Sequence, residues 1–160
     1  MIKGYITNLG KYNEGELTGE WIAFPIEEDE LAEVFKRIGI NDQYEEYFFT
    51  DWECELPLDL GEYISISKVN EYAEALEDCD VELVSAILEA TGCDIDEALE
   101  WEDDVTFYKG MKLSDVAYEL VESCYDLPEF AQRYFNYEAF ARDLSFDGYT
   151  EVAGGVIRVR

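Results

Sequence analysis

Carboxylates are the one chemically active residue type that this sequence supplies in excess. Its 160 residues include 39 Asp and Glu but no His, so the commonest general base and the commonest metal ligand are missing. Paired carboxylates can hydrolyse glycosides, but among 39 acids no particular pair stands out. Gly10 and Gly15 resemble a phosphate-binding loop that lacks the following Lys-Ser/Thr. We therefore expect a protein that is not an enzyme.

Two patterns for metal binding are incomplete. The four cysteines are 25, 14 and 31 residues apart with no CxxC pair, which argues against zinc and predicts reduced thiols in the cytoplasm. Four acids fit positions 1, 3, 5 and 12 of a calcium-binding loop: Asp78, Asp80, Glu82 and Glu89. Position 6 is Leu83 where that loop needs Gly, so we predict a helix there. A divalent-metal-binding protein remains an alternative.

The charge is concentrated in the middle of the chain. The net charge is −28, and residues 69–108 hold fourteen carboxylates without a Lys or Arg. Apolar residues at helical spacing run through this segment, so we expect it to fold. Such charge disfavours nucleic acid and anionic membranes and favours a basic partner. A solvated acidic surface is one interpretation; mimicry of nucleic acid is the other, because 28 charges match about 48 Å of duplex, on the order of 14 base pairs.

The elements that must position these acids form an α+β fold, which we expect to be elongated and built of three small units. The first unit, residues 1–58, has a net charge of −10. We predict strands at 2–9, 17–24 and 44–54, a loop at 10–15 and one helix. That helix buries Leu31, Val34, Phe35 and Ile38 and ends at Gly39.

The second unit, residues 59–102, has a net charge of −13 and is predicted to be helical. Ser67 is expected to cap a helix that runs to about Asp78. Asp80 should cap a second helix that ends at Gly92, and Asp94 should open a short third one. On the first of these helices Glu71, Glu74 and Asp78 would lie roughly 4.5–6 Å apart along one face, close to the spacing of phosphates.

The last unit, residues 103–160, has a net charge of −5 and mixes helices with strands. We predict a strand at 105–108, a helix capped by Ser114, a helix from Pro128 to about Phe135, and a helix at 137–144 capped by Asn136. A hairpin at 149–152 and 156–159 ends the chain. Because this unit is the least charged, we assign it dimerisation.

Three stretches together resemble the ArdA antirestriction proteins. Residues 8–17, followed by Gly19 and Trp21, are similar to the N-terminus of that family, and the likeness recurs at residues 38–47. A third stretch resembles the antirestriction motif of the family: Tyr137, Glu138, Ala139, Phe140, Ala141, Arg142, Asp143 and Leu144. The matches come in the order of the family and span most of the chain. We expect Tyr137, Phe140 and Leu144 to be buried.

The resemblance implies a protein carried by mobile elements that uses no cofactor and forms an elongated, three-part homodimer that mimics bent DNA. Its partner would be the methyltransferase core of a type I restriction–modification enzyme, whose DNA-binding groove it would occupy. The protein itself is expected to bind neither nucleic acid nor a membrane. The alternative is an acidic module for another basic or DNA-binding protein. The expected contact surface is distributed over Glu14, Glu16, Glu27, Glu28, Glu45, Glu46, Glu71, Glu74, Glu77, Asp78, Asp80, Glu82, Asp94, Asp96, Glu97, Glu100, Glu102, Asp103 and Asp104.

Overall fold

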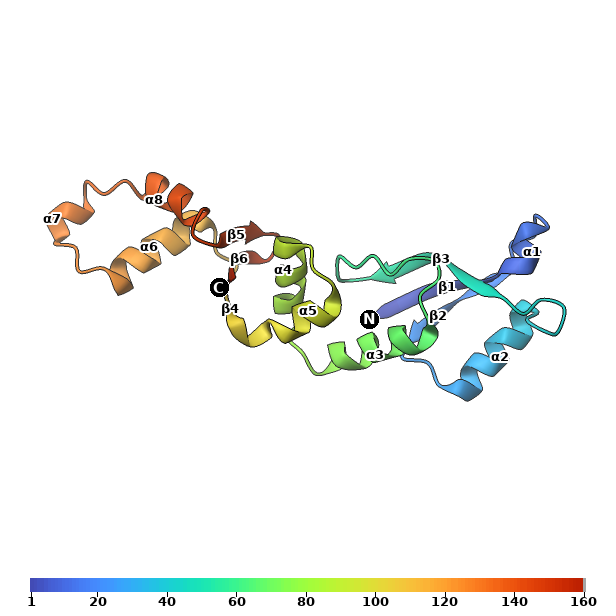
Figure 1. Ribbon diagram of the computed structural model, residues 1–160. Helices are drawn as coiled ribbons and strands as arrows, with labels where there is room; N and C mark the ends of the chain where they lie inside the picture. Colours follow the sequence, from blue (N-terminus) through green and yellow to red (C-terminus); the bar gives the residue numbers. More distant parts are fainter. Residues whose placement is uncertain (160) are drawn as a thin grey trace. The chain divides into compact units, whose positions relative to one another are not determined.

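A computed structural model describes residues 1–159 and confirms an α+β fold (Figure 1). The chain divides into two compact units, Met1–Cys79 and a second that begins at Asp80. Each unit contains its own three-stranded antiparallel sheet. The division into three units, residues 1–58, 59–102 and 103–160, stays a prediction from the sequence. None of the helices within residues 1–159 has both the length and the apolar character needed to cross a membrane.

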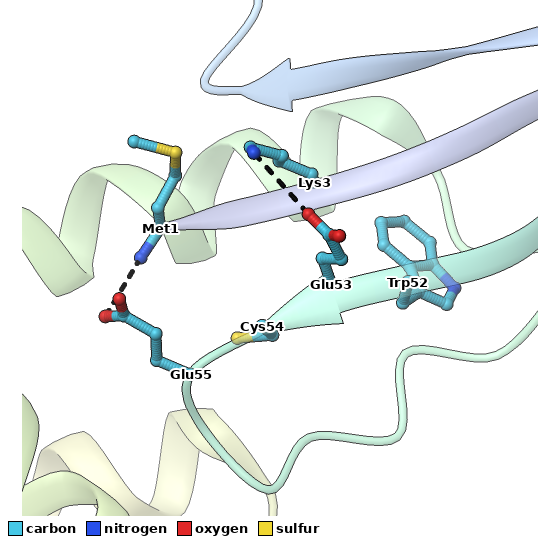
Figure 2. Close-up of a pocket in the computed structure, with 6 residues that line it drawn as sticks. All are labelled: Met1, Lys3, Trp52, Glu53, Cys54 and Glu55. Carbon is cyan, nitrogen blue, oxygen red and sulfur yellow. Dashed lines mark ion pairs between the residues drawn. The ribbon is translucent and has the colours of Figure 1, made fainter.

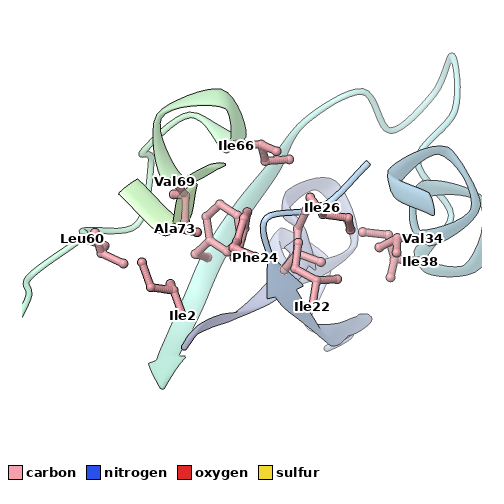
Figure 3. Packing of buried hydrophobic residues seen from close by; sticks show 12 residues of the cluster. Ile2, Ile22, Phe24, Ile26, Val34, Ile38, Leu60, Ile66, Val69 and Ala73 are labelled. Atoms are coloured by element: carbon pink, nitrogen blue, oxygen red, sulfur yellow. The ribbon is translucent and has the colours of Figure 1, made fainter. Parts of the chain in front are cut away.

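The first unit is a sheet with helices on one face. Strands β1 (Ile2–Asn8), β2 (Gly19–Phe24) and β3 (Tyr47–Cys54) are arranged in the order β2-β1-β3. Alternating side chains point to opposite faces, and the inner face carries Ile2, Ile6, Ile22, Phe24 and Phe49. Helices α2 (Glu28–Ile38) and α3 (Ile66–Glu77) pack on this face and complete the core (Figure 3).

Three boundaries predicted for this unit are wrong. The second and third strands begin at Gly19 and Tyr47, later than expected, and part of the predicted loop is a short helix, α1 (Leu9–Asn13). Helix α3 is capped by Ser65, whose side chain accepts the N–H of Lys68, and not by Ser67. The earlier start puts Ile66 on the helix, where it is buried in the core.

The second unit begins with helices and ends with a hairpin. Helices α4 (Val81–Thr91) and α5 (Ile95–Glu100) are followed by the 3₁₀ turn η1 (Glu102–Asp104), strand β4 (Val105–Lys109) and helix α6 (Leu113–Cys124). Helices α7 (Glu129–Gln132) and α8 (Tyr137–Leu144) lead to β5 (Tyr149–Val152) and β6 (Gly155–Val159), with sheet order β4-β6-β5. Buried side chains of α6, α8, β5 and β6 share one core.

Local signals placed most of these elements correctly. Asp80, Asp94 and Asn136 cap α4, α5 and α8 as predicted, since each side chain accepts backbone N–H groups at the helix start. The assignment of Ser114 as a cap is wrong: α6 starts after Lys112, whose N–H donates to the Asp115 carboxylate at 2.9 Å. The helix after Pro128 is shorter than expected and ends at Gln132.

Candidate functional site

The acidic side chains lie almost entirely on the surface. Of the 39 Asp and Glu residues, all are exposed except Glu20 and Glu102, which are half-buried. Only 11 Lys and Arg are present in the sequence, so one-to-one pairing leaves most carboxylates without a basic partner. The first unit, up to Cys79, has 20 acids and five bases, and the chain from Asp80 onward has 19 acids and six bases. Both units therefore carry a strongly negative surface.

At one end of the first unit, the two stretches that resemble the antirestriction family meet around Asn8. This side chain is buried, and its amide donates to the carbonyls of Ile38 and Gly39, each at 3.1 Å. Its oxygen accepts the N–H of Lys11 at 3.1 Å, which caps α1. Asn8 thus joins the end of β1, the start of α1 and the end of α2.

The second stretch closes over the first through Tyr44. A Cβ at Gly10 would lie 2.4 Å from the Tyr44 ring, so only Gly fits beneath that ring. The Tyr44 hydroxyl donates to Glu14 at 3.0 Å, and this hydrogen bond to a carboxylate raises the pKa of Tyr44 above its ordinary value. The packing brings segments with four exposed predicted contact residues together: Glu14, Glu16, Glu45 and Glu46.

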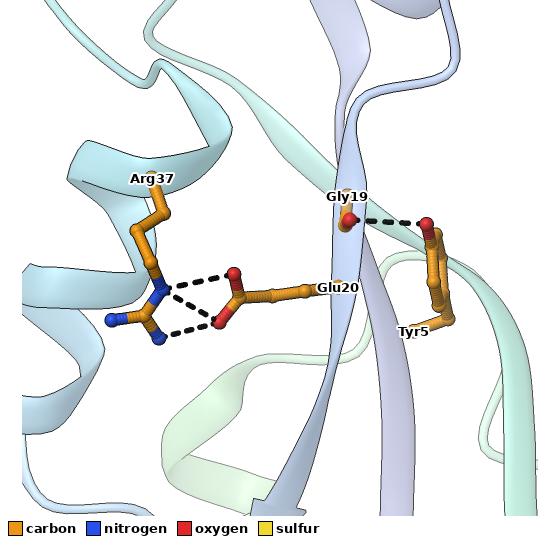
Figure 4. Close-up of polar contacts among 4 residues, drawn as sticks. All are labelled: Tyr5, Gly19, Glu20 and Arg37. Atoms are coloured by element: carbon orange, nitrogen blue, oxygen red, sulfur yellow. Dashed lines mark hydrogen bonds and ion pairs between the residues drawn. The ribbon is translucent and has the colours of Figure 1, made fainter.

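Helix α2 begins with acids and ends with bases. Glu27 and Glu28 are exposed at its start, where the partial positive charge of the helix terminus favours carboxylates. In its last turn, Arg37 makes a two-pronged ion pair with Glu20 of β2, with nitrogen–oxygen distances of 2.5–3.2 Å (Figure 4). Glu20 is therefore used to fix α2 on the sheet, while Glu27 and Glu28 face solvent.

Helix α3 presents one uninterrupted acidic face. Val69 and Ala73 turn inward to the core, whereas the predicted contact residues on this helix and at its C-cap are exposed: Glu71, Glu74, Glu77 and Asp78. Glu71 also pairs with Lys68 at 3.3 Å. The predicted stripe of acids is therefore present, because positions three and four apart share one side of a helix.

In the second unit, several acids hold the fold together. Asp80 and Asp94 accept N–H groups at helix starts, and Glu82 pairs with Lys109 of β4. Glu102 accepts the N–H of Asp80 at 3.1 Å. Glu89, which we did not single out as a contact residue, accepts the N–H of Ala153 at 3.0 and 3.1 Å and ties α4 to the β5–β6 turn.

The other predicted acids of this unit lie on short elements. The exposed set comprises Asp96, Glu97, Glu100, Asp103 and Asp104, on α5 and η1. Ile95 and Ala98 are buried on the opposite side of α5. Most of the candidate calcium loop, Asp78 to Glu89, lies in helix α4, so the predicted helix is confirmed there. Within residues 1–159, His, Cys, Asp and Glu side chains form no group of three suited to a metal ion.

The antirestriction-like motif forms helix α8, which has one buried and one exposed side. Ala141 and Leu144 are buried against α6, while Glu138, Arg142 and Asp143 are exposed. The expectation that Tyr137 and Phe140 are buried holds only in part, since both are half-buried. Arg142 lies 3.8 Å from Asp143, so a nearby acid is its observed partner.

Among the hollows lined by residues 1–159, one lies on the first unit and another on the second. The first hollow, of about 380 Å³, lies beside β1 and β3. In it the terminal amine of Met1 pairs with Glu55, and Lys3 pairs with Glu53, so its charges are already matched (Figure 2). The other, of about 280 Å³, has an apolar lining contributed by α6, α8 and the residues between them: Val121, Tyr125, Leu127, Phe135 and Phe140. Neither hollow gathers the acids.

A small α+β protein whose carboxylates are exposed over both units is suited to bind a basic surface. The chain belongs to the ArdA family: the family model for antirestriction protein (ArdA) matches residues 4–158. The matched range includes the stretches 8–17, 38–47 and 137–144, and the match confirms the predicted family and makes the protein an antirestriction protein. Comparison with curated proteins gave no match.

Proposed function

We propose that this antirestriction protein acts as a DNA mimic that occupies the DNA-binding groove of a type I restriction–modification enzyme. The observation that carries the proposal is the exposure of all but two of 39 carboxylates against only 11 bases. In the groove, carboxylates replace phosphates opposite Lys and Arg of the methyltransferase core. The protein itself binds neither nucleic acid nor membrane, and it acts in the cytoplasm where its target meets incoming DNA.

The affinity of such a complex comes from many weak contacts. Each carboxylate that meets a basic side chain releases bound ions, as a phosphate does, so affinity falls steeply with salt. The acids most suited to this role are those whose side chains are not needed to cap helices or close the fold. On this criterion Glu74, Glu77, Glu97 and Glu100 rank above Asp80, Asp94 and Glu102, whose side chains bond backbone N–H groups.

The second unit supplies the surface for a homodimer in this proposal. It exposes large aromatic side chains, with Phe130, Tyr134 and Phe146 at 72, 77 and 81% of full exposure. The apolar hollow beside α6 and α8 adds a recess of about 280 Å³. Apolar surface of this kind is what a two-fold interface buries. Sedimentation at micromolar concentration should give a dimer, and a monomer would remove this part of the proposal.

Competition with DNA tests the proposed function directly. The protein is added to a complex of a type I methyltransferase core with fluorescent duplex DNA, and the released DNA is measured at several salt concentrations. We expect stoichiometric displacement that weakens as salt rises. Displacement from an unrelated basic protein to the same extent would favour the alternative, a general acidic module, and retention of DNA by the core would refute the proposal.

A further inference from the structure

The first unit has an aromatic surface on the face of its sheet that helices α2 and α3 leave uncovered. Helices α2 and α3 pack on the inner face of the β2-β1-β3 sheet. Residues paired across neighbouring strands share a face, and the pairs Tyr5–Trp21 and Thr7–Phe48 point to the opposite, outer face. Trp21 is 43% exposed there and meets the Tyr5 ring edge-on at 5.5 Å.

Two tyrosines extend this surface over Phe48. Tyr12 of α1 meets the Phe48 ring at 5.1 Å, and Tyr63, in the segment between β3 and α3, stacks on it at 6.1 Å. Phe48 is thereby buried, whereas Tyr12 and Tyr63 remain 49 and 71% exposed. We call the set Tyr5, Tyr12, Trp21, Phe48 and Tyr63 the outer aromatic face.

The backbone holds these rings in place although they face solvent. The carbonyl of Glu62, next to Tyr63, accepts the N–H of Phe49 at 2.8 Å. The carbonyl of Gly61 accepts the Trp52 indole N–H, also at 2.8 Å. Tyr12 lies on α1, whose start is capped by Asn8. Rings fixed in this way lose little conformational freedom on binding, so they can contribute affinity at low entropic cost.

Three exposed carboxylates belong to residues that neighbour the outer aromatic face in the chain or across the strands. Glu62 precedes Tyr63 in the chain, and Asp51 is the cross-strand neighbour of Tyr5. Glu46, two residues before Phe48, is tied to the start of α1 by the bond from the Leu9 N–H to its carbonyl. All three acids are exposed. Exposed rings with carboxylates on neighbouring residues suit a planar cation, because the guanidinium of Arg stacks on rings and pairs with carboxylates, whereas the ammonium of Lys is a compact charge.

We propose that the outer aromatic face binds arginine side chains of the basic partner. In the target enzyme, these are arginines of the DNA-binding groove, an assignment that rests on the proposed function. The rings add a contact that bulk charge does not provide: the carboxylates attract any cation, and the exposed tyrosines favour guanidinium over ammonium. The negative charge around the rings argues against nucleobases as the occupant.

A first experiment uses the protein alone. Its affinities for two peptides of equal length and charge, one with arginines and one with lysines, are measured by calorimetry at fixed salt. The variant Tyr12→Leu/Tyr63→Leu removes both π faces but keeps apolar cover over Phe48, and Tyr12→Phe/Tyr63→Phe keeps the rings. Leu17→Ala, which truncates an exposed apolar side chain of the same unit, is the control. Circular dichroism checks that each variant is folded.

We expect the wild-type protein and the Phe variant to prefer the arginine peptide, and the Leu variant to lose that preference. Loss of two exposed cation–π contacts corresponds to roughly a five- to thirtyfold weaker affinity, so the Leu variant should bind the arginine peptide more weakly by up to this factor. Equal binding of both peptides by the wild-type protein would overturn the proposal, and so would an unchanged preference in the folded Leu variant. Neither result depends on the restriction enzyme, so they leave the proposed function untouched.

A second experiment measures binding to the methyltransferase core over a range of salt concentrations. Ring contacts release few ions, so the Leu variant should bind more weakly by a constant factor, with an unchanged slope of log affinity against log salt. A changed slope would mean that the rings only position carboxylates. Failure of the wild-type protein to bind the core would refute the proposed function while leaving the peptide result to stand. Dimerisation through this face, detected as a weaker dimer in the Leu variant, would also contradict the proposal.

Discussion

At the scale of single residues, Asn8 shows why a short polar side chain is required inside this protein. Its amide and its carbonyl oxygen serve three backbone groups, at the start of α1 and the end of α2, and the side chain is fully buried. Asp at this position could cap α1, but it could not donate to the carbonyls of Ile38 and Gly39. Packing inside the protein thus accounts for part of the sequence of a family-like stretch.

Replacing Asn8 by Ala should lower the free energy of unfolding by about 2–3 kcal/mol, because a helix cap is lost and a buried carbonyl loses its donor. Urea unfolding followed by circular dichroism measures this loss. Asn13→Ala removes the same chemical group at an exposed position and is the matched control. A loss no larger than that of the control would show that Asn8 does not hold the two stretches together.

Replacing Glu14 by Gln should lower the pKa of Tyr44 toward its ordinary value, because the carboxylate that accepts its hydroxyl is the main cause of the raised pKa. A group whose pKa is higher in the folded state contributes stability below its unfolded pKa, and this is lost as pH rises through the folded pKa. The contribution of Tyr44 should therefore disappear only in alkaline solution. NMR titration of labelled tyrosines, assigned with Tyr44→Phe, gives the pKa directly; an unchanged value would contradict the contact.

At the scale of elements, the acids separate into two kinds. Some close the fold: Glu20 fixes α2 on β2, and Glu89 fixes α4 on the β5–β6 turn. Others, such as the acids on the exposed face of α3, lie on the side of a helix that is opposite its buried side, and they contact solvent. Mutations of the first kind should act on stability, and mutations of the second kind should act on binding.

The variant Glu89→Ala should lower the free energy of unfolding of the second unit by about 1 kcal/mol. In the variant, the Ala153 N–H loses the Glu89 carboxylate as its acceptor and donates to water instead. Glu100→Ala, an exposed acid on the neighbouring α5, serves as the comparison and should have a smaller effect. Chemical denaturation provides both values. Binding to the methyltransferase core should change little with Glu89→Ala, apart from the loss of one charge.

Single changes on the outward acids should matter little to inhibition, and combined changes should matter greatly. Glu74→Lys alone should leave inhibition nearly intact, because one contact among many is weak. Inhibition should be abolished when a whole set is converted to amides: Glu71, Glu74, Glu77, Asp78, Glu97 and Glu100. Inhibition of DNA cleavage at increasing protein concentration distinguishes the two cases. Complete loss of activity in the single variant would refute the distributed surface.

At the scale of the whole molecule, a net charge of −28 on 160 residues opposes folding while it favours a basic partner. Repulsion among carboxylates weakens when salt shortens the screening length from ~10 Å at 0.1 M to ~3 Å at 1 M. The same screening weakens attraction to the partner. Stability and affinity should therefore respond to salt in opposite directions.

Adding NaCl from 0.1 to 1 M should raise the melting temperature of the isolated protein and weaken its complex with the methyltransferase core. Calorimetry of the free protein and competition binding measure the two trends on the same samples. Chloride should be compared with an equal ionic strength of sulfate, to separate screening from specific anion effects. A melting temperature that falls with NaCl would show that attractive ion pairs outweigh the repulsion.

The sequence by itself determined the charge, the α+β class and the helix starts with a local signal. Asp80, Asp94 and Asn136 cap helices through their own nearby N–H groups, so no distant contact is needed to place them. Charge likewise depends on composition alone, and carboxylates stay on the surface because burying them without partners is costly. These features could be predicted because their causes lie within a few residues.

Only the tertiary structure decided features whose causes lie far apart in the chain. Ser65 rather than Ser67 caps α3 because Ile66 must enter a core shared with the three strands of the sheet and with α2. Asn8 meets Gly39, and Tyr12 and Tyr63 meet over Phe48, across separations that no local pattern records. Which acids close the fold and which face outward was decided in the same way, since a carboxylate becomes structural only when folding brings a donor to it.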